Sequence, residues 1–386
     1  MTDEGEIDDL EQFHFGSQRR LNRKMARLAS QNDRSSDKQS DRDQKAQLET
    51  IEAKKQKQKL INSQIRGRVV EIWGQEILVV ADSGENLICH LRGSFKEKKG
   101  RDKNIVAVGD LVGIDRVNTS GSDKMYGSIE TIAPRYSQLS RGGNLNRNHI
   151  QLLATNIDIA MITVSVMAPM LRPAMIDRFL IAAVQGNLSP AICFTKTDLL
   201  QQKNDKGQQE LLNQCLSLYQ DQLRIPCFLL GMKEDQFHKE DLDKISRFIA
   251  GRTLVFSGPS GVGKSTIINA LTGSRQRTGE VVHLTHKGAH TTSVARLIPL
   301  TESSGFVVDT PGIRSLALFE PTRDEIKIAF TEIAETARLC KYHNCQHKLE
   351  PGCAVKEAVE TGKIRQMRYD SYQNIFNELE ETYRRR

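Results

Sequence analysis

Long hydrophobic runs are missing from this sequence of 386 residues, which argues against a transmembrane protein. The longest apolar stretch, residues 157–168, contains Asp158 and falls well short of the roughly 20 residues of a membrane-spanning helix. The start of the chain also lacks the cationic and apolar segments of a signal peptide, since it carries Asp3, Glu4, Glu6, Asp8, Asp9 and Glu11. We therefore expect a cytoplasmic protein that does not bind a membrane.

Large apolar residues are scarce in the first 62 residues, where no aromatic residue follows Phe15. A segment of this composition cannot bury a core, so residues 1–62 are predicted to form a disordered or loosely helical extension. Its charge changes from an acidic start to a basic, glutamine-rich run between Arg19 and Lys59, in a chain of formal net charge +7. Two interpretations stay open for this extension: an arm that contacts RNA and a solvated tail.

Cysteine is used sparingly, and the odd total of seven argues against a disulfide framework. Four are expected to be small core residues in a reducing compartment: Cys89, Cys193, Cys215 and Cys227. The other three form, with a histidine, the pattern Cys340-x4-Cys345-x-His347-x5-Cys353. Three thiolates and one imidazole can fill a tetrahedral Zn²⁺ shell and leave no position for a substrate, so we predict one structural zinc ion.

Residues 63–140 consist of five short strand-like runs separated by glycine-containing turns, which is typical of a small barrel of the OB type. The segment between the third and fourth runs is basic and suits contact with a nucleic-acid backbone; it contains Arg92, Lys96, Lys98, Lys99, Arg101 and Lys103. Four aromatic residues of this region could stack on bases or fill the core, and we favour the core: Trp73, Phe95, Tyr126 and Tyr136.

Residues 150–325 alternate apolar strand-like runs with amphipathic helical stretches, which predicts a doubly wound α/β domain with ligands at the carboxyl ends of its strands. One strand leads into the pattern G-x-x-x-x-G-K-S, a phosphate-binding loop. Its backbone N–H groups and Lys264 would hold the phosphates, and the Ser265 hydroxyl would bind Mg²⁺. The nucleotide-binding residues expected here are Gly258, Pro259, Ser260, Gly261, Val262, Gly263, Lys264, Ser265 and Thr266.

A second motif follows an earlier strand and reads Thr195-Lys196-Thr197-Asp198. The Asp198 carboxylate could accept two hydrogen bonds from guanine, a donor pair that adenine does not offer. An ordinary strand-to-helix turn is the alternative interpretation, and the phosphate loop downstream favours guanine binding. Thr195 stands where GTPases usually have asparagine, and we expect the loss of the amide that ties this motif to the base and the phosphate loop.

Two segments downstream of the phosphate loop could respond to the γ-phosphate. Asp309 ends an apolar strand and would hold Mg²⁺ through water, while the Gly312 N–H would contact the γ-phosphate. A turn without function is the alternative for this D-x-P-G sequence. Between it and the phosphate loop, one of Thr291 and Thr292 would complete the magnesium shell.

The guanine motif precedes the phosphate loop, the reverse of the usual order in GTPases, which indicates a circularly permuted domain. With a barrel before it and a cysteine cluster after it, the chain resembles the ribosome small-subunit-dependent GTPases from about Gln64 to its C-terminus. The resemblance implies a multidomain protein: an OB-type β-barrel at 63–140, a circularly permuted α/β P-loop GTPase domain at 150–325, and a zinc-binding helical module at 326–386. It departs from the family in its long N-terminal extension and in the sequence after residue 230, where no S-A type base-contacting loop is evident.

Catalysis needs a group that positions the attacking water, and Ile313, which follows the D-x-x-G glycine, has no hydrogen-bonding atom. By resemblance, His290 stands at the place of the family's catalytic histidine and would act once a partner docks this segment. A solvent-facing histidine is the alternative.

The resemblance implies a monomeric GTP hydrolase that binds GTP and GDP with Mg²⁺ and is stimulated by the small ribosomal subunit and its rRNA. It would couple hydrolysis to late maturation of the subunit and to its own release. The alternatives are an RNA-associated P-loop ATPase and an RNA-binding scaffold indifferent to nucleotide. Asp198 argues against the first. The second is opposed by an intact set of site residues, namely Lys264, Ser265, Asp309, Thr291 and Thr292.

Overall fold

The computed structural model describes residues 63, 65–93, 105–117, 125–142, 150–234, 236–273, 295–301, 303–309 and 321–384. The first part of it is a closed barrel with the strand order β1-β2-β3-β5-β4. Its strands are β1 (Ile65–Trp73), β2 (Glu76–Ala81), β3 (Asn86–Leu91), β4 (Leu111–Val117) and β5 (Tyr126–Ile132). Alternate residues of β2 are buried, and they join inward residues of the other strands in one core, which includes Val79, Leu87 and Ile129. The predicted five-stranded barrel is confirmed.

The central part is a six-stranded sheet with the order β10-β9-β8-β13-β15-β14. Its strands are β8 (Ile159–Ser165), β9 (Ser189–Thr195), β10 (Cys227–Leu230), β13 (Thr253–Ser257), β14 (Arg296–Pro299) and β15 (Phe306–Asp309). All neighbours are parallel except β14 and β15. Because β8 and β13 are buried along their whole length, they are continuous apolar runs rather than alternating ones.

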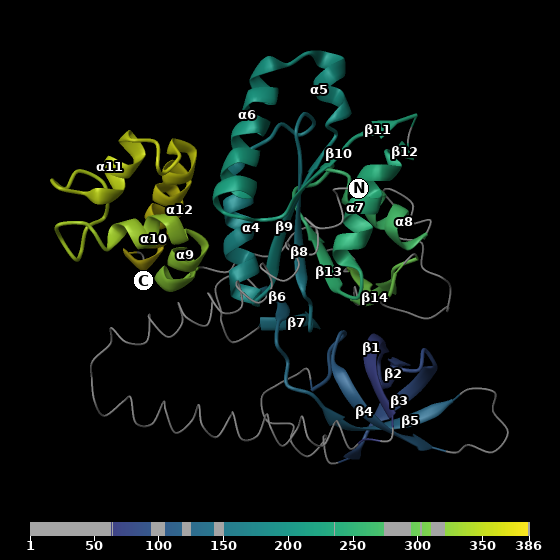
Figure 1. Ribbon diagram of the computed structural model, residues 1–386. Coiled ribbons are helices and arrows are strands. Elements are labelled where there is room, and N and C mark those ends of the chain that lie inside the picture. Colours follow the sequence, from purple (N-terminus) through teal and green to yellow (C-terminus); the bar gives the residue numbers. More distant parts are fainter. Residues whose placement is uncertain are drawn as a thin grey trace, which may run out of the picture.

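Helices cover both faces of this sheet (Figure 1). The helices α4 (Pro173–Gly186), α5 (Asp198–Lys203) and α6 (Lys206–Leu216) belong to one side, and α7 (Lys239–Ile249) and α8 (Lys264–Thr272) to the other. Residues such as Ile176 of α4 and Leu212 of α6 share one hydrophobic core with the sheet, whereas Ile245 of α7 and Ile267 of α8 share a second. The arrangement is the predicted doubly wound α/β domain.

A short two-stranded sheet joins barrel and α/β domain, and the sequence did not indicate it. It pairs β6 (Gln138–Gly142) with β7 (Ile150–Thr155). This sheet spans residues assigned to two separate ranges in the sequence, and those domain ranges stay predictions. Beyond β10, the two-residue strands β11 (Met232–Lys233) and β12 (Gln236–Phe237) form a small hairpin.

The C-terminal part is helical and packs against α4 (Figure 1). Its helices are α9 (Arg323–Ala329), α10 (Thr331–Ala337), α11 (Ala354–Glu360) and α12 (Gln366–Arg384). A capping box starts α9, since the Thr322 side chain accepts from the Glu325 N–H while the Glu325 carboxylate accepts from the Thr322 N–H. Ile181 of α4 lies within the hydrophobic core of this part, next to residues such as Phe330.

Two predictions about side chains can be compared with this fold. Cys89, Cys193 and Cys215 are buried as expected, while Cys227 is half-buried. The prediction that the barrel aromatics fill its core is wrong for Trp73, which is 46% exposed, because it ends β1 beyond Val70, the last buried residue of that strand. Tyr126 and Tyr136 are half-buried, and Phe95 lies outside the described residues.

None of the helices within the described ranges combines the length and apolar character that a membrane span requires.

Candidate nucleotide site and metal centre

The expected phosphate loop connects β13 to α8, as a strand–loop–helix unit requires. At its start a Cβ atom on Gly258 would lie 2.0 Å from the Thr163 carbonyl oxygen of β8, so only glycine fits there. Gly261 and Gly263 have φ angles of 78° and 96°, and Gly263 caps α8. These glycines turn the loop back so that α8 begins at Lys264 with its amino end towards the loop.

The Lys264 ammonium group lies across this loop. Its Nζ donates to the carbonyl oxygens of Gly258 at 2.7 Å and Pro259 at 2.6 Å. A cation that already lies among the loop's carbonyls is close to the place that bound phosphate oxygens would take. Ser265 is the next residue of α8, and its hydroxyl is a hard oxygen donor of the kind that Mg²⁺ prefers.

The guanine motif contacts the phosphate loop directly, although the two are more than sixty residues apart. The Thr195 hydroxyl donates to the Val262 carbonyl oxygen at 2.6 Å. Lys196 Nζ donates to the Gly261 carbonyl oxygen at 2.7 Å and also to that of Ala168. We expected that threonine at position 195 would leave the motif without its link to the phosphate loop. That expectation is wrong, because the Thr195 hydroxyl bonds to the loop carbonyl in place of an amide.

Asp198 stands at the first position of α5, and one oxygen of its carboxylate is already engaged. Its Oδ1 accepts from the Met232 backbone N–H at 3.0 Å. A Cβ on Gly231 would lie 2.9 Å from Thr197 Oγ1, so the chain after β10 passes directly over the motif. The segment at Gly231 and Met232 therefore packs against the motif, a contact that the sequence LGMKED did not indicate because it has no recognisable motif.

Asp309 ends β15, which pairs with β13 and thus lies beside the strand that leads into the phosphate loop. Its Oδ2 accepts from Arg296 Nε of β14 at 3.2 Å. The structure therefore brings Asp309 near the phosphate loop with a cation as partner. Four expected site residues lie outside the described residues: His290, Thr291, Thr292 and Gly312.

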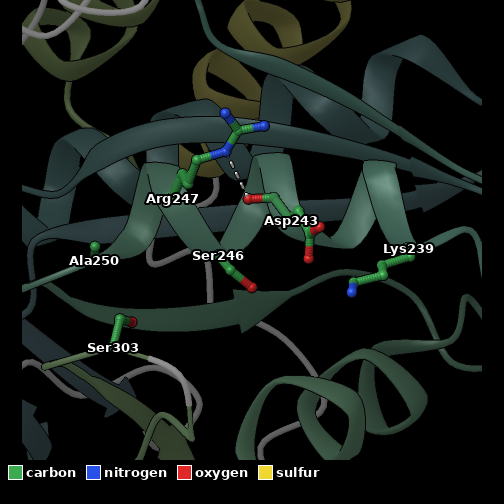
Figure 2. Close-up of a pocket in the computed structure, with 6 residues that line it drawn as sticks. All are labelled: Lys239, Asp243, Ser246, Arg247, Ala250 and Ser303. Carbon is green, nitrogen blue, oxygen red and sulfur yellow. Dashed lines mark hydrogen bonds between the residues drawn. The ribbon is translucent and has the colours of Figure 1, made fainter.

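A surface hollow of about 470 Å³ lies along α7 and is lined by Lys239, Asp243, Ser246, Arg247, Ala250 and Ser303 (Figure 2). In it Arg247 Nε donates to the Asp243 carbonyl oxygen. An adjoining hollow contains Ala270 and Leu271, the carboxyl end of α8, while the phosphate loop lies at its amino end. None of these lining residues belongs to the nucleotide motifs.

The predicted metal ligands Cys340, Cys345, His347 and Cys353 come together with all their donor atoms within 4.8 Å of one another. His347 Nδ1 lies 3.6 Å from Cys340 Sγ and 3.5 Å from Cys353 Sγ, and the two sulfurs are 3.9 Å apart. Tetrahedral zinc with Zn–S of about 2.3 Å and Zn–N of about 2.0 Å requires spacings of about 3.5 to 3.8 Å. The donor set and its size therefore fit zinc.

Neighbouring groups hold the ligand loop in shape. The Tyr369 hydroxyl donates to the His347 carbonyl oxygen at 2.5 Å. The Glu350 carboxylate accepts from the backbone N–H groups of Gln346, Lys348 and Leu349, and these bonds lower the pKa of Glu350 to about 2. Burial lowers the pKa of His347, which favours the neutral ring that binds a metal.

The sequence model of the RsgA GTPase family matches residues 132–319. The chain is 36% identical over 318 residues to the small ribosomal subunit biogenesis GTPase RsgA of Bacteroides fragilis strain YCH46, covering 82% of this chain and 98% of that protein. It is 34% identical over 328 residues to the protein of the same name from Chlorobaculum parvum, covering 83% of this chain and all of the relative.

Two solved structures resemble this one. YjeQ from Thermotoga maritima superposes with a TM-score of 0.62 at 27% identity, over 82% of this chain and 98% of its own. YloQ, described as a circularly permuted GTPase, also gives 0.62 at 27% identity, over 82% and 95%. Barrel, permuted α/β domain and cysteine–histidine cluster thus occur in one chain in the order that the resemblance implied. Because its curated relatives match over almost their whole length, the chain belongs to the RsgA GTPase family.

Proposed function

We propose that this protein is a GTPase that binds the small ribosomal subunit and couples GTP hydrolysis to late maturation of the subunit and to its own release. The observation that carries the proposal is the direct bonding of the guanine motif to the phosphate loop, through Thr195 to Val262 and Lys196 to Gly261. This bonding would bring base selection and phosphate binding together in one site. The proposed partner, the small ribosomal subunit, is inferred from the name that the relatives carry.

Base selection is assigned to Asp198 with the segment at Gly231 and Met232. One carboxylate oxygen is held by the Met232 N–H, which orients the other edge of the carboxylate for the N1–H and exocyclic amine of guanine. Lys196 would cover the base with its stem while its ammonium stays on the loop carbonyls. ATP offers no matching donor pair and is expected to bind poorly.

Mg²⁺ would be held by Ser265, Asp309 and one of Thr291 and Thr292, and when bound it would neutralise charge that develops on the phosphates. Before Mg²⁺ binds, Arg296 holds the Asp309 carboxylate in place. His290 is assigned to orient the attacking water, because Ile313 cannot do so. The segment proposed to sense the γ-phosphate runs from Asp309 to Gly312, whose N–H would contact that phosphate.

The C-terminal part is proposed to hold zinc as a structural ion and to face ribosomal RNA. The metal loop presents the exposed basic residues Lys341, His343 and Lys348, and Leu349 beside them is 90% exposed. Exposed basic side chains suit a phosphate backbone. The protein is proposed to act in the cytoplasm as a monomer.

The experiment is co-sedimentation of the full chain with purified small ribosomal subunits, in the presence of GDP or of a non-hydrolysable GTP analogue. We expect at least about tenfold tighter association with the analogue, because release is assigned to hydrolysis. Equal association with both nucleotides would contradict coupled release. No association with either would remove the ribosomal function while leaving a guanine-nucleotide site.

A further inference from the structure

One barrel arginine reaches into the α/β domain. Arg68 of β1 donates from Nη1 to the Thr253 hydroxyl at 2.6 Å and to the Asn156 carbonyl oxygen at 3.3 Å. Its guanidinium also lies 5.8 Å from the centre of the Phe306 ring. Thr253 is only 2% exposed, so this bond is made inside the junction between the two domains.

Two of the three contacts of Arg68 fall on the first residues of strands whose carboxyl ends lead to the nucleotide site. Thr253 begins β13, which ends at Ser257 before the phosphate loop, and Phe306 begins β15, which ends at Asp309. The two starting residues are themselves paired in the sheet. At about 3.3 Å per residue, the path along β13 from Thr253 to the loop is roughly 16 Å.

A second set of bonds fixes the same end of the sheet. The Tyr136 hydroxyl lies 2.8 Å from the Asn156 carbonyl oxygen and 3.1 Å from Asp158 Oδ1, and it shares its single proton between these two acceptors. Asp158 in turn accepts from the Thr253 N–H through Oδ2 at 2.9 Å. The barrel side of the junction therefore reaches Thr253 by two routes, directly from Arg68 and through Asp158 from Tyr136.

We propose that Arg68 is a positioning residue that couples RNA binding by the barrel to GTP hydrolysis. When RNA shifts or stiffens the barrel, the bond from Arg68 would move the amino ends of β13 and β15 together, and these rigid strands would carry the displacement to the phosphate loop and Asp309. The inference rests on the proposed function and on the nucleic-acid contact that the sequence predicts for the basic segment between the third and fourth barrel strands. It assigns no RNA contact to Arg68, whose hydrogen bonds lie within the protein.

The test compares Arg68→Ala with Arg66→Ala, a matched control on the same strand. Arg66 is exposed and pairs with Asp82 on the barrel surface, so its loss removes the same charge without touching the junction. The measurements are GTP hydrolysis without subunits, the maximal rate with saturating small subunits, and subunit affinity in the GDP state. For Arg68→Ala we expect hydrolysis without subunits and subunit affinity in the GDP state to match wild type. The maximal rate with saturating subunits should fall about tenfold.

Thr253→Val supplies a second, independent variant, because it removes the acceptor of the Arg68 bond at nearly constant volume. It should show the same loss, and the double variant should lose no more than either single one. Arg68→Lys should recover part of the rate. Melting temperatures of all variants separate this loss from unfolding, which would lower unstimulated hydrolysis as well.

Full stimulation of both Arg68→Ala and Thr253→Val would overturn the inference, as would a weaker subunit affinity with an unchanged maximal rate, which would make Arg68 only a binding residue. If the wild-type protein itself shows no stimulation, the proposed function fails. If small subunits stimulate hydrolysis by the wild type and by both variants alike, the role of Arg68 is overturned while the proposed function stands.

Discussion

The Thr195 hydroxyl is one of two side-chain groups, with the Lys196 ammonium, that join the two halves of the nucleotide site. Thr195 is buried at the end of β9, and its Oγ1 contacts the Val262 carbonyl oxygen of the phosphate loop. A threonine side chain is shorter than asparagine, so the contact requires that β9 and the loop approach closely. At the start of the same loop, an added Cβ on Gly258 would lie 2.0 Å from the Thr163 carbonyl oxygen, so glycine lets the loop pack closely against the neighbouring strand β8.

Replacing Thr195 with valine should weaken guanine-nucleotide binding. The change keeps the volume but leaves the Val262 carbonyl without this donor. The expected loss is about 1–3 kcal/mol, which is about five- to 140-fold in affinity if the nucleotide complex feels it fully. Fluorescent GDP dissociation measures it. Thr195→Ser keeps the hydroxyl and is the control, and a serine variant as weak as the valine variant would show that the hydrogen bond is irrelevant.

His290→Ala should separate binding from chemistry. If His290 orients the water, the variant binds GTP with wild-type affinity but loses at least about a hundredfold of the rate stimulated by small subunits, within the range of general acid–base effects. Single-turnover hydrolysis with bound subunits is the measurement. A stimulated rate like that of wild type would assign the water to another residue.

At the scale of elements, the metal loop between α10 and α11 has little apolar core of its own. Leu339 and Leu349 are 77% and 90% exposed, so the cysteine–histidine cluster and the Glu350 bonds must hold this loop. Zinc is therefore expected to contribute folding free energy to the loop and to the helices it joins.

Cys353→Ser should reduce zinc from one per chain to well below one, as measured by elemental analysis. Hydrogen exchange is then expected to increase in residues 338–364, while GDP affinity stays at the wild-type value because the nucleotide motifs lie in the α/β domain. Cys227→Ser, outside the cluster, is the control. Full zinc content after loss of Cys353 would contradict the assigned ligand set.

A buried charge network fastens α12 to α4 and α10. The Arg368 side chain is 1% exposed; it bonds to Asp177 of α4 and, at 2.7 Å, to Glu332 of α10, and it lies 3.9 Å from the centre of the Phe330 ring. The Tyr219 hydroxyl also donates to Asp177 at 2.7 Å. Burial alone would lower the pKa of Arg368, but the two carboxylates raise it above its ordinary value, so the guanidinium stays charged.

Arg368→Ala should lower the free energy of unfolding by about 3–5 kcal/mol, since it leaves Asp177 buried without its cation. Urea titration of the full chain measures this loss. Arg323→Ala, which removes an exposed partner of Glu380, should cost no more than about 1 kcal/mol. Equal losses for the two variants would mean that the buried network does not fasten the helices.

The strands that position the site were predictable because each is a compact apolar run, such as residues 253–257, followed by its motif. The cysteine–histidine spacing likewise predicted a cluster that the fold brings together. The contacts that depend on distant segments were not predictable: Met232 on Asp198, Arg68 on Thr253, and the β6–β7 pair. Nothing in the local sequence of Met232 or Arg68 marks the partner that the topology brings to it.

In the whole molecule, three parts meet around the central sheet (Figure 1). The barrel joins the amino ends of β8 and β13 through Arg68 and Tyr136, and the C-terminal helices pack on α4. The phosphate loop and Asp309 lie at the carboxyl ends of neighbouring strands of the same sheet. Two parts proposed to contact RNA are thus fixed to one sheet that also carries the nucleotide site, which gives a physical route between subunit binding and hydrolysis.

The most direct test of the account is steady-state hydrolysis of GTP and of ATP by the purified full chain, each with and without purified small ribosomal subunits. We predict slow GTP turnover that rises at least about a hundredfold with subunits, because a partner completes the catalytic site, and no stimulated turnover of ATP, because Asp198 selects guanine. Equal use of ATP, or GTP turnover that small subunits do not change, would contradict it.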